Sequence, residues 1–593
     1  MKKFVKSIVA LSIFGAISIS AVQAAQYKIE PITEVSSHKY TYGQFQNGNS
    51  QEYLVSATSS YNYPVIVQYL FKDLVLQQDS AGNIYYSFTY KGAQGQTLTL
   101  GFLEDPEAYL SGTPTARDLE LSITYLQVKK GNLTYQQIED QSVFVDLGTG
   151  AQQVSVWDKG FSLEFPALTR STEDYLNGIS SNGWLYGSGS APHLPFSFSD
   201  IDTVTTYWLS EFDLKAYVSV DNGTTILPVE SPINLYGGVS AILDMAEVDG
   251  NQVAVGYASI AYNEQILNGI ENSCLSGESN VIQQNACIEE LRDSLYYLNA
   301  FKWTFDNNGN VIDSEILGQL ITPHVDDTRL HGSYATAINS SGVAVGYSTG
   351  WFQDKLDAPV TNPKINEAVT NYAVIFKDGE VFDFTDDHTE FYNSRANDIN
   401  DNGIAVGYVT KSVLGDSRTQ FYYIDTNKAD LEMVMPTGFF NGSSSTARAI
   451  NENGFIVGDA EVENHTDSNS NPRRRNGFLY DINTDTLTNL NDFLECNLGY
   501  EIIEARDIND LNEITATAVK KVESRDAQGE IELDDDGNIV YEDVLKAVKL
   551  TPLAGEIVNC DAEEGKLTKR QGASFSWLLI LLSGFISIAR RFK

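Results

Sequence analysis

The sequence predicts an all-β protein: an array of about six or seven repeats arranged like a β-propeller, preceded by a β-rich N-terminal segment. A stretch of twelve residues recurs along the chain, and each copy is followed by a second strand–turn–strand element. The composition agrees, because 45 Gly, 32 Tyr and 28 Phe against only 39 Lys and Arg are typical of a turn-rich β protein. A β-solenoid is less favoured, since it needs a shorter and stricter period.

The recurring stretch reads Ala-x-x-Ile-Asn-x-x-Gly-x-x-Val-Gly, and its clearest copy lies at residues 396–407. The pattern predicts two short strands joined by a tight turn. The second element carries aromatic residues around an Asp-Gly or Asn-Gly turn, so each unit contains four short strands. Further copies lie at 335–346 and 447–458, a decayed one lies at 505–516, and weaker ones lie at 176–187 and 245–256, where Ile179 and Val248 take the place of the repeated Ile.

The repeated residues are predicted to be structural. Ile and Val alternate into a core, Asn bonds the backbone of its own turn, and the first Gly supplies a positive φ. The Gly after the Val lets a neighbouring backbone approach closely. These turn residues are Asn339, Gly342, Gly346, Asn400, Gly403, Gly407, Asn451, Gly454 and Gly458. Function is therefore expected in what differs between copies: the loops at 262–297, 459–475 and 522–544, and the unrepeated N-terminal segment.

The chain begins with a secretory signal peptide at 1–24, in which a basic start and an apolar run end at small residues. Cleavage is predicted after Ala24; a retained membrane anchor is the alternative. Residues 25–165 are expected to be β-rich, as a separate domain or as elaborated first blades, with strands that include 65–76 and 119–128. Residues 43–57 resemble a degenerate repeat copy. The propeller repeats occupy 166–562, where 288–295 is the best candidate for a helix.

Four cysteines, Cys274, Cys287, Cys496 and Cys560, are present without a C-x-x-C pair, which argues against a zinc knuckle. In an exported protein disulfides are the default. Three pairings are possible, and proximity favours Cys274 with Cys287 and Cys496 with Cys560.

A net charge of −40 opposes binding to nucleic acid and to anionic lipid. A solvated acidic surface is favoured over cation binding. No cofactor is predicted; calcium is the one metal considered, at Asp534, Asp536 and Asn538, although a hairpin turn explains their spacing better. His324 and His331 flank two aspartates that could hold a metal, but a solvated loop is the favoured interpretation.

The sequence carries no G-x-S-x-G elbow, P-loop, dinucleotide fingerprint or H-E-x-x-H motif. The prediction is therefore a non-enzymatic binding, adhesion or envelope structural protein. The alternative is a secreted propeller hydrolase that acts on polysaccharide. It requires a cluster of carboxylates with raised pKa values at one end of the propeller channel.

The chain ends with a polar linker at 563–574 and an apolar segment with a basic tail at 575–593. The apolar run would form a helix of about 22 Å, which is short for a stable membrane span. The basic tail should stay cytoplasmic. These features indicate a sorting signal that is processed near Gly572 and Ala573, with a plain tail anchor as the alternative.

The Ala-x-x-Ile-Asn copies, together with the Asn-Ala-Phe-Lys-Trp strand at 299–303, resemble extracellular HAF-repeat proteins. Residues 490–496, 504–509, 550–555 and Cys560 resemble the DUF3466 family of marine gammaproteobacteria, which are Gram-negative. The tail resembles the GlyGly-CTERM signal, although Ala573 stands in place of its second Gly. The resemblance implies partners: signal peptidase, a rhombosortase-like intramembrane protease and type II secretion. It also implies a cell-surface or extracellular location after processing, and no assigned activity.

Overall fold

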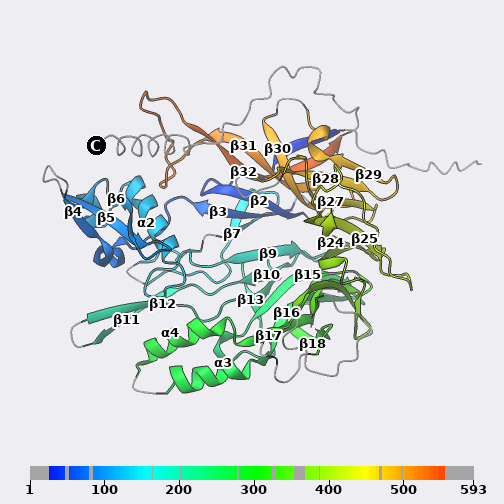
Figure 1. Cartoon of the computed structure of the whole chain (residues 1–593), viewed down its shortest axis with the longest axis horizontal. Coiled ribbons are helices and arrows are strands. Elements are labelled where there is room, and N and C mark those ends of the chain that lie inside the picture. The colour runs from blue at the N-terminus through cyan, green and yellow to red at the C-terminus, as the bar shows by residue number, and fades with distance from the viewer. Residues whose placement is uncertain are drawn as a thin grey trace, which may run out of the picture.

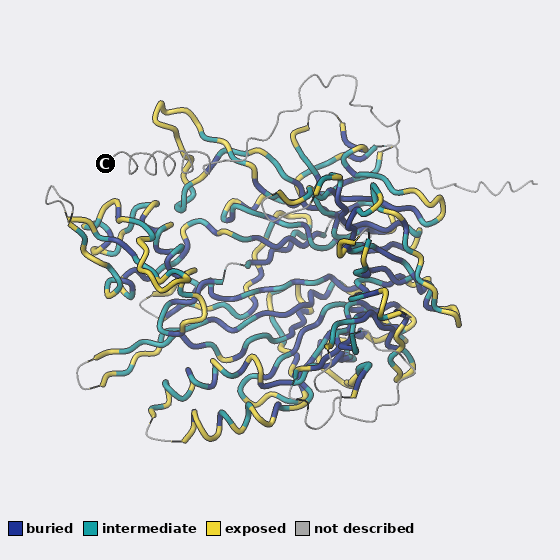
Figure 2. Tube along the Cα trace, in the orientation of Figure 1, coloured by how far each residue is buried: buried dark blue, intermediate teal, exposed yellow. Residues whose placement is uncertain are grey.

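The computed structural model describes residues 26–553 except 47–51, 79–83, 140, 163–164, 201–202, 277–278, 323–326, 328, 353–367, 386, 414, 467–470 and 496–497. The described chain is all-β in character, with many small antiparallel sheets (Figure 1). Short strands form because β-branched and aromatic residues alternate with polar ones between Gly, Asn and Asp turns. The buried segments lie mainly in these sheets, and exposed ones on the helices and hairpin tips (Figure 2).

Seven of the described sheets follow one another along the chain. They are β2 (His38–Gln46), β3 (Tyr53–Ser60), β7 (Ser142–Asp146) and β8 (Ala151–Val154); β9 (Asp174–Ile179), β10 (Leu185–Gly189), β13 (Lys215–Ser219) and β14 (Leu227–Val229); β15 (Ser240–Val248), β16 (Asn251–Tyr262), β17 (Tyr296–Phe305) and β18 (Val311–Gly318); β19 (Ser333–Ile338), β20 (Ala344–Trp351), β21 (Val369–Lys377) and β22 (Glu380–Asp383); β23 (Phe391–Ile399), β24 (Ile404–Val413) and β25 (Asp416–Asp425); β26 (Ser445–Ile450), β27 (Phe455–Glu461), β28 (Arg475–Asp481) and β29 (Thr486–Asn489); and β30 (Tyr500–Ile508), β31 (Ile514–Glu523), β32 (Tyr541–Leu553) and β1 (Gln26–Pro31).

The first strands of these sheets contact one another in chain order, from β2 to β9, β15, β19, β23, β26 and β30, and β30 contacts β2. We call this closed series of contacts the first-strand ring. The last sheet contains both ends of the described chain, because β1 pairs antiparallel with β32. The core lies between successive sheets, where for example Val457 of β27 packs in one cluster with Ala516 of β31.

The same β-bulge recurs where the first two strands of a sheet pair. Ala396 lies opposite Gly407 and the register shifts before Asp398. Equivalent shifts occur at residues 43–45, 186–187, 242–244, 335–337, 447–449 and 505–507. The sheet that contains residues 43–57 therefore has the geometry of a repeat copy.

One repeat assignment was wrong. Gly256 lies opposite Ile242, so Met245, three residues further on, takes the place of the repeated Ile. Val248 instead pairs with Asn251 in a hairpin that extends beyond the usual turn. Aligning the copies in sequence on the final glycine placed Val248 at the position of the repeated Ile. The alignment was misleading because the longer hairpin adds residues to both strands.

Three insertions depart from the repeat pattern and form what we call the insertion lobe (Figure 1). The first contains a 3-10 helix (Val67–Asp73), β4 (Val75–Gln78), β5 (Ile84–Lys91), β6 (Thr97–Phe102), α1 (Pro106–Ser111) and α2 (Ala116–Val128). The second is the hairpin of β11 (Leu194–Asp200) and β12 (Thr203–Leu209), and the third contains α3 (Glu264–Gly269), a π-helical turn (Ile270–Cys274) and α4 (Val281–Arg292). Two short 3-10 helices, Leu235–Gly237 and Leu490–Phe493, lie elsewhere.

Two strand predictions in the first insertion were wrong. Residues 119–128 belong to helix α2, and residues 65–76 are mostly the 3-10 helix. The Thr115 side chain caps α2 by accepting from the backbone N–H of Asp118. The buried residues of α2 follow a helical spacing: Asp118, Leu119, Ser122, Tyr125 and Leu126. The helix expected at 288–295 exists as α4, but it starts earlier, at a capping box formed by Asn280 and Gln283.

Candidate binding site

The repeated turn residues support the scaffold. Asn400 Oδ1 accepts from the backbone N–H of Ile404 at 2.9 Å, inside its own turn. Its Nδ2 donates to the carbonyl oxygen of Asn451 in the next sheet at 3.0 Å. Asn339 donates in the same way to Asn400, and Asn451 to Asn509. Each Asn therefore closes one turn and joins it to the following one.

The repeated glycines meet two separate requirements. Gly342, Gly403 and Gly454 have φ between 76° and 82°, the left-handed turn conformation. Gly407 is needed for space, because a Cβ there would lie 1.9 Å from the carbonyl oxygen of Arg395. Equivalent close approaches occur at Gly346 and Gly458. The bulge brings the neighbouring carbonyl over the glycine, as the sequence predicts.

A set of carboxylates in the first-strand ring was not predicted. Asp398 accepts from the backbone N–H of Ile399 and from that of Ile450 in the next sheet, both at 2.8 Å. Asp244 and Asp507 do the same for their neighbouring sheets. Each carboxylate therefore clamps two sheets together. A signal was present, since Asp precedes the repeated Ile in two of the copies, at 398 and 507.

Burial raises the pKa of Asp398 to about 7 and that of Asp507 to about 6, and it also raises the pKa of Asp244. The negative charges of Asp244 and Asp507 add to the effect at Asp398. The hydrolase alternative requires carboxylates of this kind. However, both oxygens of each carboxylate already accept backbone N–H groups, so a structural role accounts for them.

The disulfide between Cys274 and Cys287 is confirmed, with a Cα–Cα distance of 5.5 Å. It joins the π-helical turn to α4. Cys496 and Cys560 lie outside the described residues, as do the processing residues Ala24, Gly572 and Ala573 and the apolar segment near the C-terminus. None of the helices in the described part of the chain combines the length and the apolar composition that crossing a bilayer requires.

The three insertions pack against one another. Leu133 from the first, Leu209 from the second and Ala286 from α4 share one buried cluster. Polar contacts reinforce this: Glu289 of α4 accepts from the backbone N–H and the hydroxyl of Ser210, and Arg292 Nε donates to Asp213 at 2.7 Å.

Between these elements lies a polar pocket of about 510 Å³, which we call the insertion pocket. Its carboxylates occur in pairs. Burial, followed by the neighbouring Asp213, raises the pKa of Asp293, and burial together with Glu173 raises the pKa of Glu139. Each pair therefore holds a proton more tightly than an isolated carboxylate does. Sequence reasoning missed the pocket, because residues beside β9 and β10, such as Glu173 and Ser190, meet insertions whose packing no repeat predicts.

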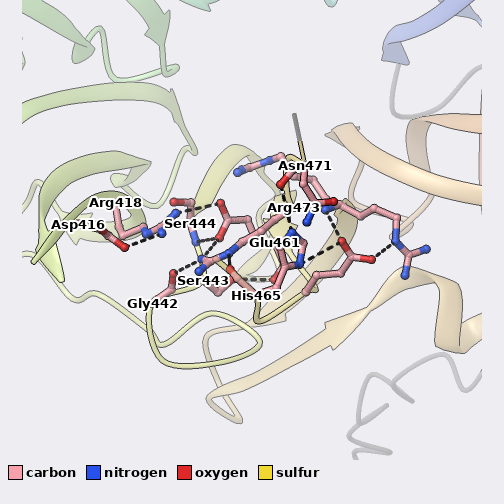
Figure 3. A network of polar contacts seen from close by, with 12 residues as sticks. Asp416, Arg418, Gly442, Ser443, Ser444, Glu461, His465, Asn471 and Arg473 are labelled. Atoms are coloured by element: carbon pink, nitrogen blue, oxygen red, sulfur yellow. Dashed lines mark hydrogen bonds and ion pairs between the residues drawn. The ribbon is translucent and has the colours of Figure 1, made fainter. Parts of the chain in front are cut away.

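The loop at 459–475 is built around Glu461 (Figure 3). Glu461 is buried, and its carboxylate accepts from Arg473 at 2.8 Å and from the backbone N–H of Ser444 at 3.2 Å. Arg418 approaches the other carboxylate oxygen at 3.6 Å. The next two arginines are also paired, Arg474 with Glu463 at 2.6 Å and Arg475 with Asp459 at 2.5 Å. All three arginines of this run therefore form ion pairs within the protein.

The suggested calcium loop forms a hairpin turn. Asp534 accepts from the backbone N–H groups of Asp536 and Asn538 at 3.0 and 2.8 Å. Calcium binding there remains a prediction. His324 lies outside the described residues, whereas His331 contacts Asp327 at 3.0 Å. Among the residues that the structure describes, no group of three or more His, Cys, Asp or Glu side chains is arranged to hold a metal ion.

Comparison with known proteins gives one strong match. The sequence profile described as "Protein of unknown function (DUF3466)" matches residues 3–591. No curated protein matches the chain. Solved structures resemble it weakly, with TM-scores of 0.28 for a puromycin-hydrolysing peptidase of Mycobacterium tuberculosis and 0.30 for prolyl oligopeptidase B of Galerina marginata, each 10% identical. These matches cover 80% and 82% of this chain but only 55% and 65% of theirs.

An ulvan lyase bound to a saccharide is 9% identical with a TM-score of 0.28, over 79% of this chain and 98% of that one. TM-scores this low do not establish a shared fold. The profile match, in contrast, spans nearly the whole sequence. The chain belongs to the DUF3466 family of proteins of unknown function.

Proposed function

We propose that this protein is an exported, cell-surface-associated binding protein without enzymatic activity, built as a seven-bladed β-propeller. The closed first-strand ring and the seven successive sheets support the architecture. The pairing of β1 with β32 also supports it, because placing the first and the last described strand in one blade is a direct way to close such a ring.

The export part of the proposal rests on the two chain ends. The signal peptide at 1–24 directs the chain to signal peptidase, and the tail resembles the GlyGly-CTERM signal for a rhombosortase-like protease and type II secretion. Before processing, the segment at 575–593 anchors the protein with its basic tail in the cytoplasm. Intact-mass analysis of the protein released from cells tests this. A mass that retains both ends would refute it.

The binding part rests on one observation: the three insertions assemble into a single lobe with an open pocket. The repeated Asn and Gly residues join the sheets, whereas the insertions depart from the repeat pattern and add a surface that the repeats do not provide. A pocket of this size accommodates a small ligand or a short segment of a larger one.

A glycan and peptide array probed with the mature protein tests the binding function. The variant Glu290→Arg reverses the charge of an exposed side chain that lines the insertion pocket. Glu264→Arg on α3 makes the same change outside this pocket and serves as the control. We expect Glu290→Arg alone to reduce ligand retention. Retention of no ligand by the unaltered protein would contradict the proposal.

A second candidate is the hydrolase acting on polysaccharide. The paired carboxylates of the insertion pocket favour it, because a carboxyl group with a raised pKa beside an ionised one can act as a general acid. Release of reducing ends from soluble polysaccharides tests this activity. Loss of that release in Asp293→Asn, in a protein that still folds, would support hydrolysis over simple binding.

A further inference from the structure

The first and last sheets of the described chain meet at a pocket of about 730 Å³, between β2 on one side and β31 and β32 on the other. We call it the closure pocket. It is separate from the insertion pocket and shares no lining residue with it.

The closure pocket is cationic in a protein of net charge −40. Five cationic side chains line it against two carboxylates, those of Glu34 and Glu523. The cations are Lys39, Lys520, Lys521, Arg525 and Lys546. Acidic residues outnumber basic ones about two to one along the chain, so the surface as a whole is negative. This cluster makes the electrostatic potential locally positive.

Among the described residues, few of these cations have a close anionic partner, although the charge of Glu34 acts on Lys546. Lys39 pairs with Glu542 at 2.6 Å. Within the described ranges, the salt bridges include none formed by the other four cations. Instead, Lys520 donates to the hydroxyl of Tyr500 at 2.7 Å, and Lys546 to the carbonyl oxygen of Lys39 at 3.2 Å. Burial lowers the pKa of Lys546, and a bound anion would stabilise its charged form.

A buried imidazole adds an independent sign of a ligand. His38 lines the closure pocket and is 1% exposed. Its Nδ1 lies 2.9 Å from the hydroxyl of Ser37, whereas its Nε2 meets no hydrogen-bond partner among the residues that the structure describes. Burial lowers the pKa of His38 to about 4, so the ring is neutral near pH 7. When Nδ1 accepts from Ser37, Nε2 carries the hydrogen and offers a donor that a ligand oxygen would satisfy.

Aromatic side chains accompany the cations. Tyr61, Tyr500 and Tyr541 line the same pocket, and Tyr541 is exposed. Flat aromatic faces beside lysine groups suit a sugar ring that carries a charged oxygen, since one surface takes the apolar face and the other takes the charge.

The arm between β31 and β32 fixes one edge of the pocket. Its turn at 526–529 accepts hydrogen bonds from Asn62, whose backbone donates to Ala527 at 2.8 Å and whose side chain donates to Gln528 at 2.7 Å. The Gln528 side chain in turn donates to the carbonyl oxygen of Pro114 in the first insertion at 3.1 Å. Arg525 at the base of the arm is therefore held beside the closure pocket.

We propose that the closure pocket binds an acidic saccharide, whose carboxylate or sulfate oxygens contact the lysine and arginine side chains and His38. The size of the pocket corresponds to a few sugar residues. Nucleic acid is disfavoured, because a long polyanion would also approach the acidic remainder of the surface.

Isothermal titration calorimetry of the mature protein tests the proposal. Three oligosaccharides of matched length serve as probes, one a uronate, one sulfated and one neutral, and inorganic sulfate serves as the free oxyanion. We expect at least one of the two acidic oligosaccharides to bind, with an affinity that falls as salt increases, and the neutral one to fail. Equal binding of the neutral probe, or binding of the free oxyanion alone, would overturn the saccharide assignment.

The double variant Lys521→Glu/Arg525→Glu changes two exposed side chains, so it should fold. We expect it to bind the acidic probe at least about tenfold more weakly. Lys428→Glu, exposed and distant in sequence, is the control and should bind normally. Unchanged affinity in the double variant, with an unchanged unfolding transition, would refute the site. The Glu290→Arg variant of the insertion pocket should leave this binding intact, which keeps the two sites distinguishable.

Discussion

The side-chain amide of Asn400 donates to the carbonyl oxygen of Asn451 at 3.0 Å, across the boundary between two neighbouring sheets. The same side chain closes its own turn through Oδ1. A single residue type therefore specifies both the hairpin and its attachment to the next sheet. This dual use explains why Asn recurs at this position in the strong copies.

The inter-sheet bond can be isolated with Asn400→Asp. The carboxylate keeps the acceptor for Ile404 but loses the donor and faces the carbonyl oxygen of Asn451 instead. We expect the free energy of unfolding to fall by about 3 kcal/mol, because the pair is buried. Asn427→Asp removes a donor to the carbonyl oxygen of Asn402 at an exposed position and should cost less than about 1 kcal/mol. Chemical denaturation measures both; equal losses would contradict this account.

The repeated glycine of the second strand should tolerate no side chain. In Gly407→Ala, the new Cβ would lie 1.9 Å from a backbone carbonyl oxygen, which only a backbone shift can relieve. We expect a loss of about 3 kcal/mol in the free energy of unfolding. Gly269→Ala, where a Cβ meets nothing within 4 Å, is the control and should be neutral or slightly stabilising. The difference between the unfolding midpoints of Gly407→Ala and Gly269→Ala tests this expectation.

The repeats made the strand pairs, the turn-closing role of Asn400 and the close approach at Gly407 predictable, because short-range turn chemistry determines them. The bond from Asn400 to the next sheet was not predicted. Helix α2 was missed although its signals were present: Thr115 as a cap and a helical spacing of buried residues. The Asp398 clamp was missed for another reason. Its carboxylate acts on Ile450 in the next sheet, and only the spatial register reveals that contact. The closure pocket likewise combines residues separated by about 480 positions, such as Lys39 and Lys520.

The raised pKa values of Asp398 and Asp507 predict a decrease in stability as pH rises. In the unfolded chain both carboxyls ionise near pH 4, whereas in the folded protein they ionise at about 7 and about 6. Between these values the native state holds more protons, so the free energy of unfolding falls with increasing pH. We expect Asp398→Asn to flatten this dependence between pH 5 and 8 by on the order of 2 kcal/mol. Denaturation at pH 5, 6.5 and 8 measures it, and an unaltered slope in the variant would rule out this assignment.

The disulfide should stabilise the insertion lobe locally. Cys274 and Cys287 are 13 residues apart, and a loop of this length corresponds to about 3 kcal/mol. In the variant Cys274→Ser/Cys287→Ser we expect faster hydrogen exchange in α4 and unchanged exchange in β24 and β27. Uniformly faster exchange across all sheets would instead show that the insertion is part of the global folding unit.

Neighbouring arginines in the loop at 459–475 should differ sharply in their contribution. Arg473 and its partner Glu461 are both less than 10% exposed at their side chains, whereas Arg474 is 52% exposed. Arg473→Ala would remove the closer of the two described ion pairs of the buried carboxylate and leave Arg418 at 3.6 Å, so we expect a loss of about 3 kcal/mol. Arg474→Ala breaks a pair that solvent already screens and should cost less than about 1 kcal/mol. Urea denaturation of the two variants separates these outcomes.

The double variant Arg473→Ala/Glu461→Gln tests whether charge is the cause. Part of the loss should be recovered in it, because the buried negative charge of Glu461 is then absent. Failure of that recovery would mean that Arg473 acts through packing against Phe440, whose ring lies 5.5 Å from the guanidinium, rather than through its charge.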